Sequence, residues 1–333
     1  MSKWRNILLN VLKIIFTLGI VIYLVNAGRI NPEEIKKYGE KPQTLAFNLL
    51  LVLCLPFIGA IRWQGLLKAL NIKLGFIQCL QLTWVGFFFS SFLPGAVTGD
   101  ILKGYYLEKK IGRDSRRETV VSLLTDRICG VFGLVLLGGS AALLSFVFDF
   151  QLNDLAAGFG LLLIIGVLAI ACFLAVIFFP WQSRDPIEAL LTHLPLSRIF
   201  LRVYEGFRIF KNQPRYLFMA LFYSILNHAI ISTAIINVVW LFNSEIAAFS
   251  QLKVLPFAMV TTVIPVAPAG IGIGHAAFQS LYSLVGFSQG ADAFNLFLAL
   301  QLPVYLLGAV FYLSLKKDRG INDSAVKNYS AVQ

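Results

Sequence analysis

The chain has 333 residues, of which 58% are hydrophobic and 14% charged, and its formal net charge is +11. A mean hydropathy of +0.77 is far too high for a soluble globular domain and excludes that class. The apolar runs are continuous and about twenty residues long, which excludes a transmembrane β-barrel and predicts an all-α polytopic membrane protein. The excess of cations indicates basic cytoplasmic loops. It predicts no nucleic-acid partner, since no basic and aromatic domain lies outside the apolar runs.

Six apolar segments are long enough to cross the bilayer. The first is predicted to be an uncleaved signal anchor, although Val25-Asn26-Ala27 also fits a cleavage site. Basic residues at the start, in three internal connections and in the tail predict that both termini are cytoplasmic. The basic loop 28–43 does not fit this orientation. The six segments cover residues 7–27, 44–61, 119–148, 156–179, 216–242 and 293–315.

Two further apolar stretches are interrupted by proline and glycine. The first, Gly75 to Asp100, lies between basic connections, and the second, Val254 to Phe287, lies between an external connection and a span that returns to the cytoplasm. Each arm is too short to cross, so we predict two re-entrant hairpins that enter the bilayer from opposite sides. The alternative is that the proline and glycine residues only kink ordinary spans.

Span, hairpin and span follow one another twice, in residues 44–148 and, with opposite orientation, in residues 216–315. This order predicts an inverted repeat within one membrane domain, the architecture that lets one central site open to either side. Residues 181–213 are predicted to form a cytoplasmic linker. Aromatic and arginine side chains occupy opposite helical faces between Ser197 and Lys211. This pattern predicts an amphipathic helix in the membrane interface, either as a plain anchor or near a lateral route for lipids.

Four motifs along these segments carry a resemblance to a known family: Gly59-Ala60-Ile61-Arg62-Trp63, Phe92-Leu93-Pro94-Gly95 with Gly99-Asp100, Ser122 to Arg127 (SLLTDR), and Pro265 to Gly272 (PVAPAGIG). With them the chain resembles the lysylphosphatidylglycerol synthase transmembrane-region family of flippase-like proteins. The resemblance implies lipid movement without synthesis, since the chain ends at Gln333 without the separate synthase domain. It has Lys103 and His275 where the family commonly has arginine and glutamate. A cationic lipid substrate therefore does not follow from the resemblance alone.

Ionisable residues in apolar segments are costly unless they are paired or hydrated, and they mark candidate sites. Asp100 and Lys103, at i and i+3, are predicted to pair on one helical face. Asp126 and Arg127 either line a site or anchor a span at the interface. Arg62, at the expected end of a span, either binds a lipid phosphate or anchors the membrane edge. The candidate substrate-binding residues are Arg62, Pro94, Gly95, Asp100, Lys103, Asp126, Arg127, Pro268, Gly270, Gly272 and His275.

The sequence contains no HExxH or GxSxG motif and no metal-spaced set of acidic residues, so we expect no catalysis and no cofactor. The hypothesis is a translocase for an anionic phospholipid or a polyprenyl-phosphate-linked glycolipid in the bacterial inner membrane. Arg62 and Lys103 would neutralise the phosphate, and backbone amides near the two breaks would donate hydrogen bonds. One alternative is a membrane enzyme that uses Asp100, Asp126 and His275 as acid and base groups. Another is a non-transporting scaffold for a partner lipid-modifying enzyme.

Overall fold

The computed structural model describes residues 36, 39–92, 98–112, 115–148, 154–179, 185–193, 195, 197–262 and 272–330. Every regular element within these residues is helical, which confirms the all-α prediction. The elements are α3 (Pro42–Ala69), α4 (Phe76–Phe92), α5 (Thr98–Ile111), α6 (Arg116–Phe148), α7 (Asp154–Phe178), α8 (Pro186–Thr192), α9 (Ser197–Arg208), η2 (Ile209–Asn212), α10 (Pro214–Phe242), α11 (Ala248–Thr262), α12 (Ile273–Ser283) and α13 (Gly290–Ser330).

Four helices contain segments long and apolar enough to cross a membrane: α3, α6, α10 and α13. They coincide with four of the predicted spans, although α3 continues past the expected end at Ile61 to Ala69. α7 covers a fifth predicted span with 25 helical residues. The remaining one, residues 7–27, lies outside the described residues. The chain is therefore a polytopic α-helical membrane protein, as its composition predicts.

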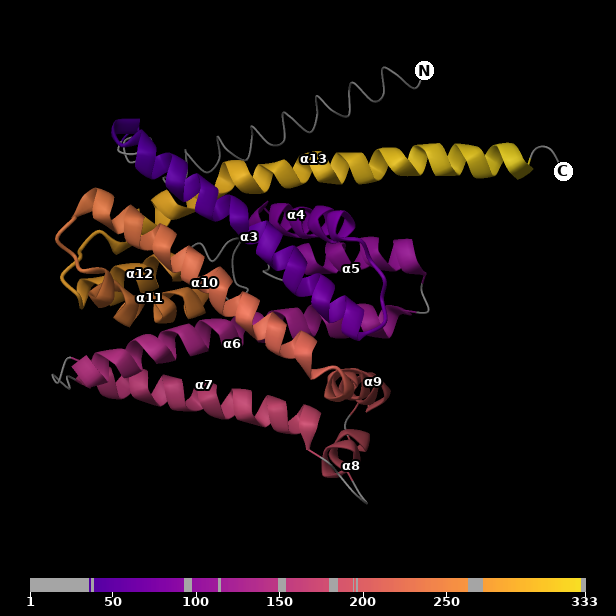
Figure 1. The fold of residues 1–333 in the computed structure, drawn as a ribbon, viewed down its shortest axis with the longest axis horizontal. Helices are drawn as coiled ribbons and strands as arrows, with labels where there is room; N and C mark the ends of the chain where they lie inside the picture. The colour runs from indigo at the N-terminus through magenta and orange to yellow at the C-terminus, as the bar shows by residue number, and fades with distance from the viewer. Residues whose placement is uncertain are drawn as a thin grey trace.

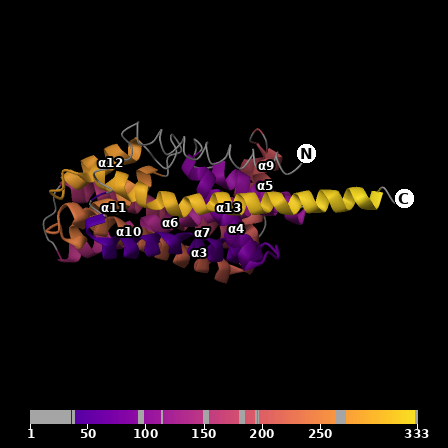
Figure 2. The same cartoon turned by 90° about the horizontal axis from the view of Figure 1, so that it is seen from above.

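Each interrupted stretch forms two short helices that pack against each other. α4 and α5 flank residues 93–97, and α11 and α12 flank residues 263–272. The four helices have 17, 14, 15 and 11 residues. At 1.5 Å per residue they are about 16–26 Å long, which is less than the roughly 30 Å of bilayer hydrocarbon. Figures 1 and 2 show the two pairs in opposite halves of the bundle, with α11 and α12 at the left and α4 and α5 towards the right.

In Figure 1, α6, α7 and α13 run close to the long axis of the molecule, and α3 and α10 cross it obliquely. α3 and α5 end, and α6 and α10 begin, at the same end of the bundle, on the right in Figure 1, beside α8 and α9. Cationic residues gather there, including Lys68 at the end of α3, Lys109 and Lys110 at the end of α5, and Arg116 at the start of α6. We call this end the basic end.

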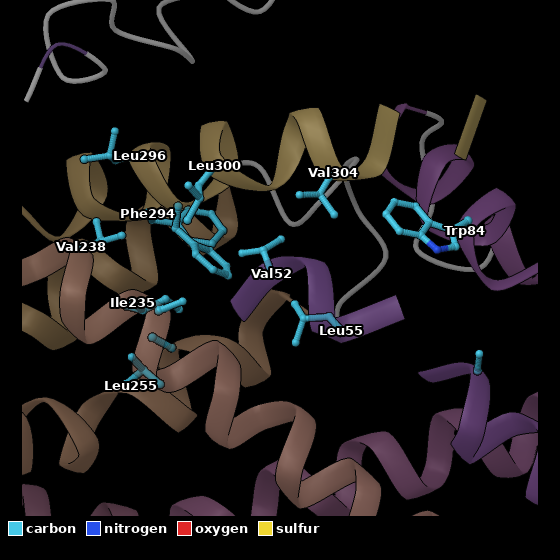
Figure 3. Close-up of a cluster of buried hydrophobic side chains, with 14 of the residues drawn as sticks. Val52, Leu55, Trp84, Ile235, Val238, Leu255, Phe294, Leu296, Leu300 and Val304 are labelled. Carbon is cyan, nitrogen blue, oxygen red and sulfur yellow. The ribbon is translucent and has the colours of Figure 1, made fainter. Parts of the chain in front are cut away.

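Two apolar clusters hold the helices together. The larger joins α3, α4, α5, α10, α11, α12 and α13, and Figure 3 shows Val52 and Leu55 facing side chains such as Ile235 and Leu300. The smaller joins the ends of α3 and α10 near the basic end with α6, α7 and η2. Lipid chains are as apolar as these side chains, so helices in a bilayer associate through close packing. Such packing is visible at Gly133 of α6, where a Cβ atom would lie 2.5 Å from Cβ of Ser224 on α10.

The predicted amphipathic helix exists as α9, but much of its apolar face packs inside the protein. Tyr204 is buried, and the Phe207 ring lies edge-on to Phe173 of α7 with ring centroids 5.6 Å apart. Asp185 caps α8 and accepts a hydrogen bond from the Tyr204 hydroxyl. Burial, together with this bond, raises the pKa of Tyr204. Tyr204 and Phe207 therefore dock α9 onto the rest of the bundle, whereas Phe200 stays exposed.

Candidate functional site

Five charged side chains from three helices meet inside the bundle, towards the basic end. Asp126 on α6 accepts two hydrogen bonds from Arg62 on α3, Nε to Oδ1 at 2.7 Å and Nη2 to Oδ2 at 3.0 Å. Nζ of Lys103 on α5 lies 3.8 Å from the same Oδ2 atom. Arg127, the next residue on α6, forms an ion pair with Asp100 on α5. We call these five residues the ion cluster.

Neutral groups complete the surroundings of the ion cluster. Nη1 of Arg62 donates a hydrogen bond of 3.0 Å to Oγ of Ser224 on α10. Nζ of Lys103 lies 3.8 Å from the centre of the Trp63 ring, a cation–π contact, and Trp63 in turn donates to Ser122. Sequence reasoning missed Ser224, because nothing marks a serine 162 residues away from Arg62 as its partner. Trp63 directly follows Arg62 in the sequence, and this position could have marked it as a further residue of the site.

The ion cluster has a buried part and a more open part. The side chains of Arg62, Asp126 and Lys103 expose only 13%, 11% and 5% of their surface. The Arg127 and Asp100 side chains expose 33% and 23%. Two carboxylates face three cations, so the cluster carries one excess positive charge. Desolvating such groups costs several kcal/mol each, and that cost is offset only by close pairing, which the bidentate Arg62–Asp126 contact provides.

The pairing differs from the sequence prediction. Asp100 and Lys103 do not pair with each other on α5, because both reach across to α6, where Arg127 and Asp126 are adjacent. α5 begins directly after the first break. Asp100 and Lys103 lie in its first two turns, and both side chains contact α6. The contacts across the helices are thus set by the packing of α5 on α6, which local spacing does not reveal.

Comparison with known proteins shows the family of the chain. The family described as the lysylphosphatidylglycerol synthase TM region matches residues 10–309. The chain belongs to this family. It is also similar to a UPF0104 membrane protein of Pyrococcus horikoshii, with 24% identity over 307 residues, covering 82% of this chain and 88% of that protein. No solved structure matches.

In this member of the lysylphosphatidylglycerol synthase TM family, the side chain of Arg62 packs between helices. Arg62 lies seven residues before the end of α3, which corresponds to about 10 Å along the axis. Its guanidinium group is occupied by Asp126 and Ser224. Asp126 is likewise buried between helices. Both side chains are therefore engaged within the bundle, and their position relative to the membrane interface stays a prediction.

The residues predicted near the second break lie apart from the ion cluster. The backbone N–H of Gly272, whose φ is +93°, donates to Nδ1 of His275 at 3.2 Å. Because Nδ1 accepts this bond, Nε2 carries the hydrogen and donates it to Oδ1 of Asn295 on α13, 2.6 Å away. Thus His275 caps α12 and ties it to α13. Figures 1 and 2 show α12 and α5 in opposite halves. The remaining predicted site residues, Pro94, Gly95, Pro268 and Gly270, lie outside the described residues.

Proposed function

We propose that the protein is a lipid translocase, without catalytic chemistry of its own, for an anionic phospholipid or a polyprenyl-phosphate-linked glycolipid. The observation that carries the proposal is the ion cluster, with its excess positive charge, inside a bundle of apolar helices. Ionisable groups at membrane depth are costly and by default mark a pathway for a polar substrate. The barrier to lipid movement is the dehydration of the charged headgroup, and fixed cations lower it by replacing water.

The arrangement of the short helices supports the same proposal. α4 and α5 are joined through the first break, α11 and α12 through the second, and the pairs occupy opposite halves of the bundle. Two half-crossing hairpins in opposite orientation, flanked by full spans, would form the inverted repeat by which transporters expose one site to each side in turn. The basic end would face the cytoplasm of the inner membrane, with both chain termini on that side.

Within this mechanism the two parts of the ion cluster have different tasks. Arg62 is held by Asp126 and Ser224, and Lys103 supplies charge beside them from the wall of the first hairpin. The more exposed Arg127 can exchange the Asp100 carboxylate for a phosphate oxygen without leaving either partner in a dry environment. Lys103 and Arg62 then stabilise the phosphate electrostatically while the acyl chains stay in lipid.

The test is the transfer of a fluorescent anionic phospholipid between the leaflets of reconstituted vesicles. Lys103→Met keeps the bulk of the side chain and leaves the Arg62–Asp126 pair intact, so folding should survive. We expect a loss of transfer of about tenfold, which corresponds to roughly 1.4 kcal/mol in the barrier. Lys110→Met, on the exposed side of the same helix, is the matched control and should transfer lipid at the wild-type rate. Wild-type transfer by Lys103→Met would contradict the assignment.

A further inference from the structure

The contact between α5 and α6 continues beyond the ion cluster and ends in a further ion pair. The two helices run in opposite directions, so Asp100 meets Arg127, Gly104 meets Thr119 and Leu123, and Glu108 meets Arg116. The Glu108–Arg116 pair, with Nε and Oε1 3.7 Å apart, lies at the basic end. None of the outer residues on this interface was among the candidates from sequence.

A cavity of about 640 Å³ opens at this outer pair. It is lined by Tyr105, Glu108 and Lys109 of α5 and by Arg116 of α6. Its volume falls within the roughly 300–1,000 Å³ of ordinary ligand pockets. Among the described residues that line it, two cations and one carboxylate leave one excess positive charge. The half-exposed ring of Tyr105 adds an apolar face with a polar tip, which suits the boundary between lipid chains and headgroups.

Exposure falls in steps from this cavity into the bundle. The arginine side chain of each successive ion pair exposes 78% at Arg116, 33% at Arg127 and 13% at Arg62. A phosphate group could replace the carboxylate at Arg116 and at Arg127, while Arg62 stays paired with Asp126. An anion that moves along this series loses its water gradually, and at every stage a cation replaces part of the lost hydration.

We propose that the cavity at Tyr105, Glu108, Lys109 and Arg116 is a vestibule that binds the phosphate group of an anionic lipid before it passes to Arg127. The proposal rests on the proposed function, since it names the cytoplasmic approach to the same site. Lys109 and Arg116 bind the phosphate, and Glu108 competes with it for Arg116. Glu108 thereby keeps the vestibule from retaining the lipid too tightly.

Binding of short-chain lipids to the purified full-length protein tests the vestibule independently of transport. Native mass spectrometry would compare short-chain phosphatidylglycerol with short-chain phosphatidylcholine. We expect Lys109→Gln/Arg116→Gln to weaken phosphatidylglycerol binding about fivefold or more and to leave phosphatidylcholine binding unchanged. Glu108→Gln should strengthen phosphatidylglycerol binding, because it removes the competing carboxylate. Lys110→Gln/Arg198→Gln removes the same charge from exposed positions outside the cavity and should have less than a twofold effect.

Three outcomes would overturn the vestibule. The first is unchanged phosphatidylglycerol binding by Lys109→Gln/Arg116→Gln. The second is an equal loss in the control variant, which would show general surface electrostatics. The third is equally strong binding of glycerol 3-phosphate, which would assign the cavity to a soluble phosphate ester. If these binding results come out as expected but wild-type vesicles transfer no lipid, the proposed function fails while the lipid-binding cavity stands.

Discussion

The two interrupted stretches look alike in sequence but differ in chemistry. The α4–α5 pair brings Asp100 and Lys103 to a partner helix that supplies the opposite charges. The α11–α12 pair is packed through apolar and aromatic groups, with Phe278 of α12 stacked on Phe294 of α13 at 4.5 Å between ring centroids. Its one ionisable candidate, His275, is engaged in capping its own helix.

This difference shows that an interruption in an apolar stretch does not by itself create a polar site. Short helices flank both breaks, but they meet α6 at different places. α5 reaches the charged residues of α6, whereas α11 packs on α6 at Gly138, where the nearest atoms belong to Pro256. In the proposed function, the charge that would bind a phosphate group is therefore concentrated where α5 meets α6, and the second pair would contribute packing. Four substitutions should separate these two kinds of contribution.

The largest effect on stability is expected from Asp126→Leu. It removes the carboxylate between Arg62 and Lys103 and leaves two buried cations facing each other, at a cost of about 3–5 kcal/mol. Unfolding by SDS in mixed micelles would measure the change. The double variant Arg62→Met/Asp126→Leu, which removes one cation as well, should recover much of the loss. No recovery would show that the pair is not what holds these helices together.

Gly99→Ala should rank second, because it forces the first pair apart. A Cβ atom at residue 99 would lie 2.1 Å from the carbonyl oxygen of Gly86 on α4, so the backbones must separate. We expect a loss of about 2–3 kcal/mol and a parallel loss of lipid transfer. Gly75→Ala, where the nearest atom is 3.8 Å away, is the control and should change stability by less than about 1 kcal/mol. Equal effects of the two substitutions would contradict the close contact of α4 and α5.

His275→Ala probes the second pair and should cost about 1 kcal/mol, since it removes the cap from the Gly272 amide. His275→Asn keeps an acceptor for this amide and should restore most of that loss. Lipid transfer, measured in vesicles at a temperature where both variants are folded, should stay near the wild-type rate. A loss of transfer as large as that of Lys103→Met would mean that the imidazole acts on the substrate.

The smallest effect is expected at α9, far from either break. Tyr204→Phe deletes the hydroxyl that donates to Asp185 and should cost about 1 kcal/mol or less. Because the pKa of Tyr204 is raised above its ordinary 10.0, this contribution is fully present below pH 10 and is lost as the pH rises through the raised pKa. Wild-type protein should therefore approach the stability of Tyr204→Phe in alkaline buffer. A difference that grows with pH would refute this assignment.

Much of the fold follows from the sequence, because apolar runs near twenty residues have few alternatives in a bilayer. Four of the six predicted spans and both helix breaks follow from hydropathy, proline and glycine alone. α3 continues eight residues beyond the predicted end of its span, from Ile61 to Ala69. Asp126, whose carboxylate pairs with Arg62 and offsets the cost of burying its charge, lies 64 residues further along the chain. The inverted repeat stays a prediction.

The candidate site was harder to predict than the helices. Its charged residues were all selected from the sequence, because charge in an apolar segment is conspicuous. Their partners were not, since i and i+3 spacing suggests a bond within α5, whereas packing directs both side chains to α6. Ser224 and the outer residues Lys109 and Arg116 carry no local signal, because serines and terminal cations are ordinary in membrane helices. α9 shows the same limit, as its periodicity reveals an apolar face without telling what covers it.

Transport by this mechanism requires that the two pairs of short helices enter the bilayer from opposite sides. The most direct test is the sidedness of single cysteines in a background without the four native ones. We predict that cysteines at Lys73 and Lys110, which flank the first pair, react with an impermeant reagent only from the cytoplasmic side. Those at Asn243 and Ser288, which flank the second, should react only from the opposite side. Labelling of Lys73→Cys and Lys110→Cys from different sides would contradict the proposed architecture.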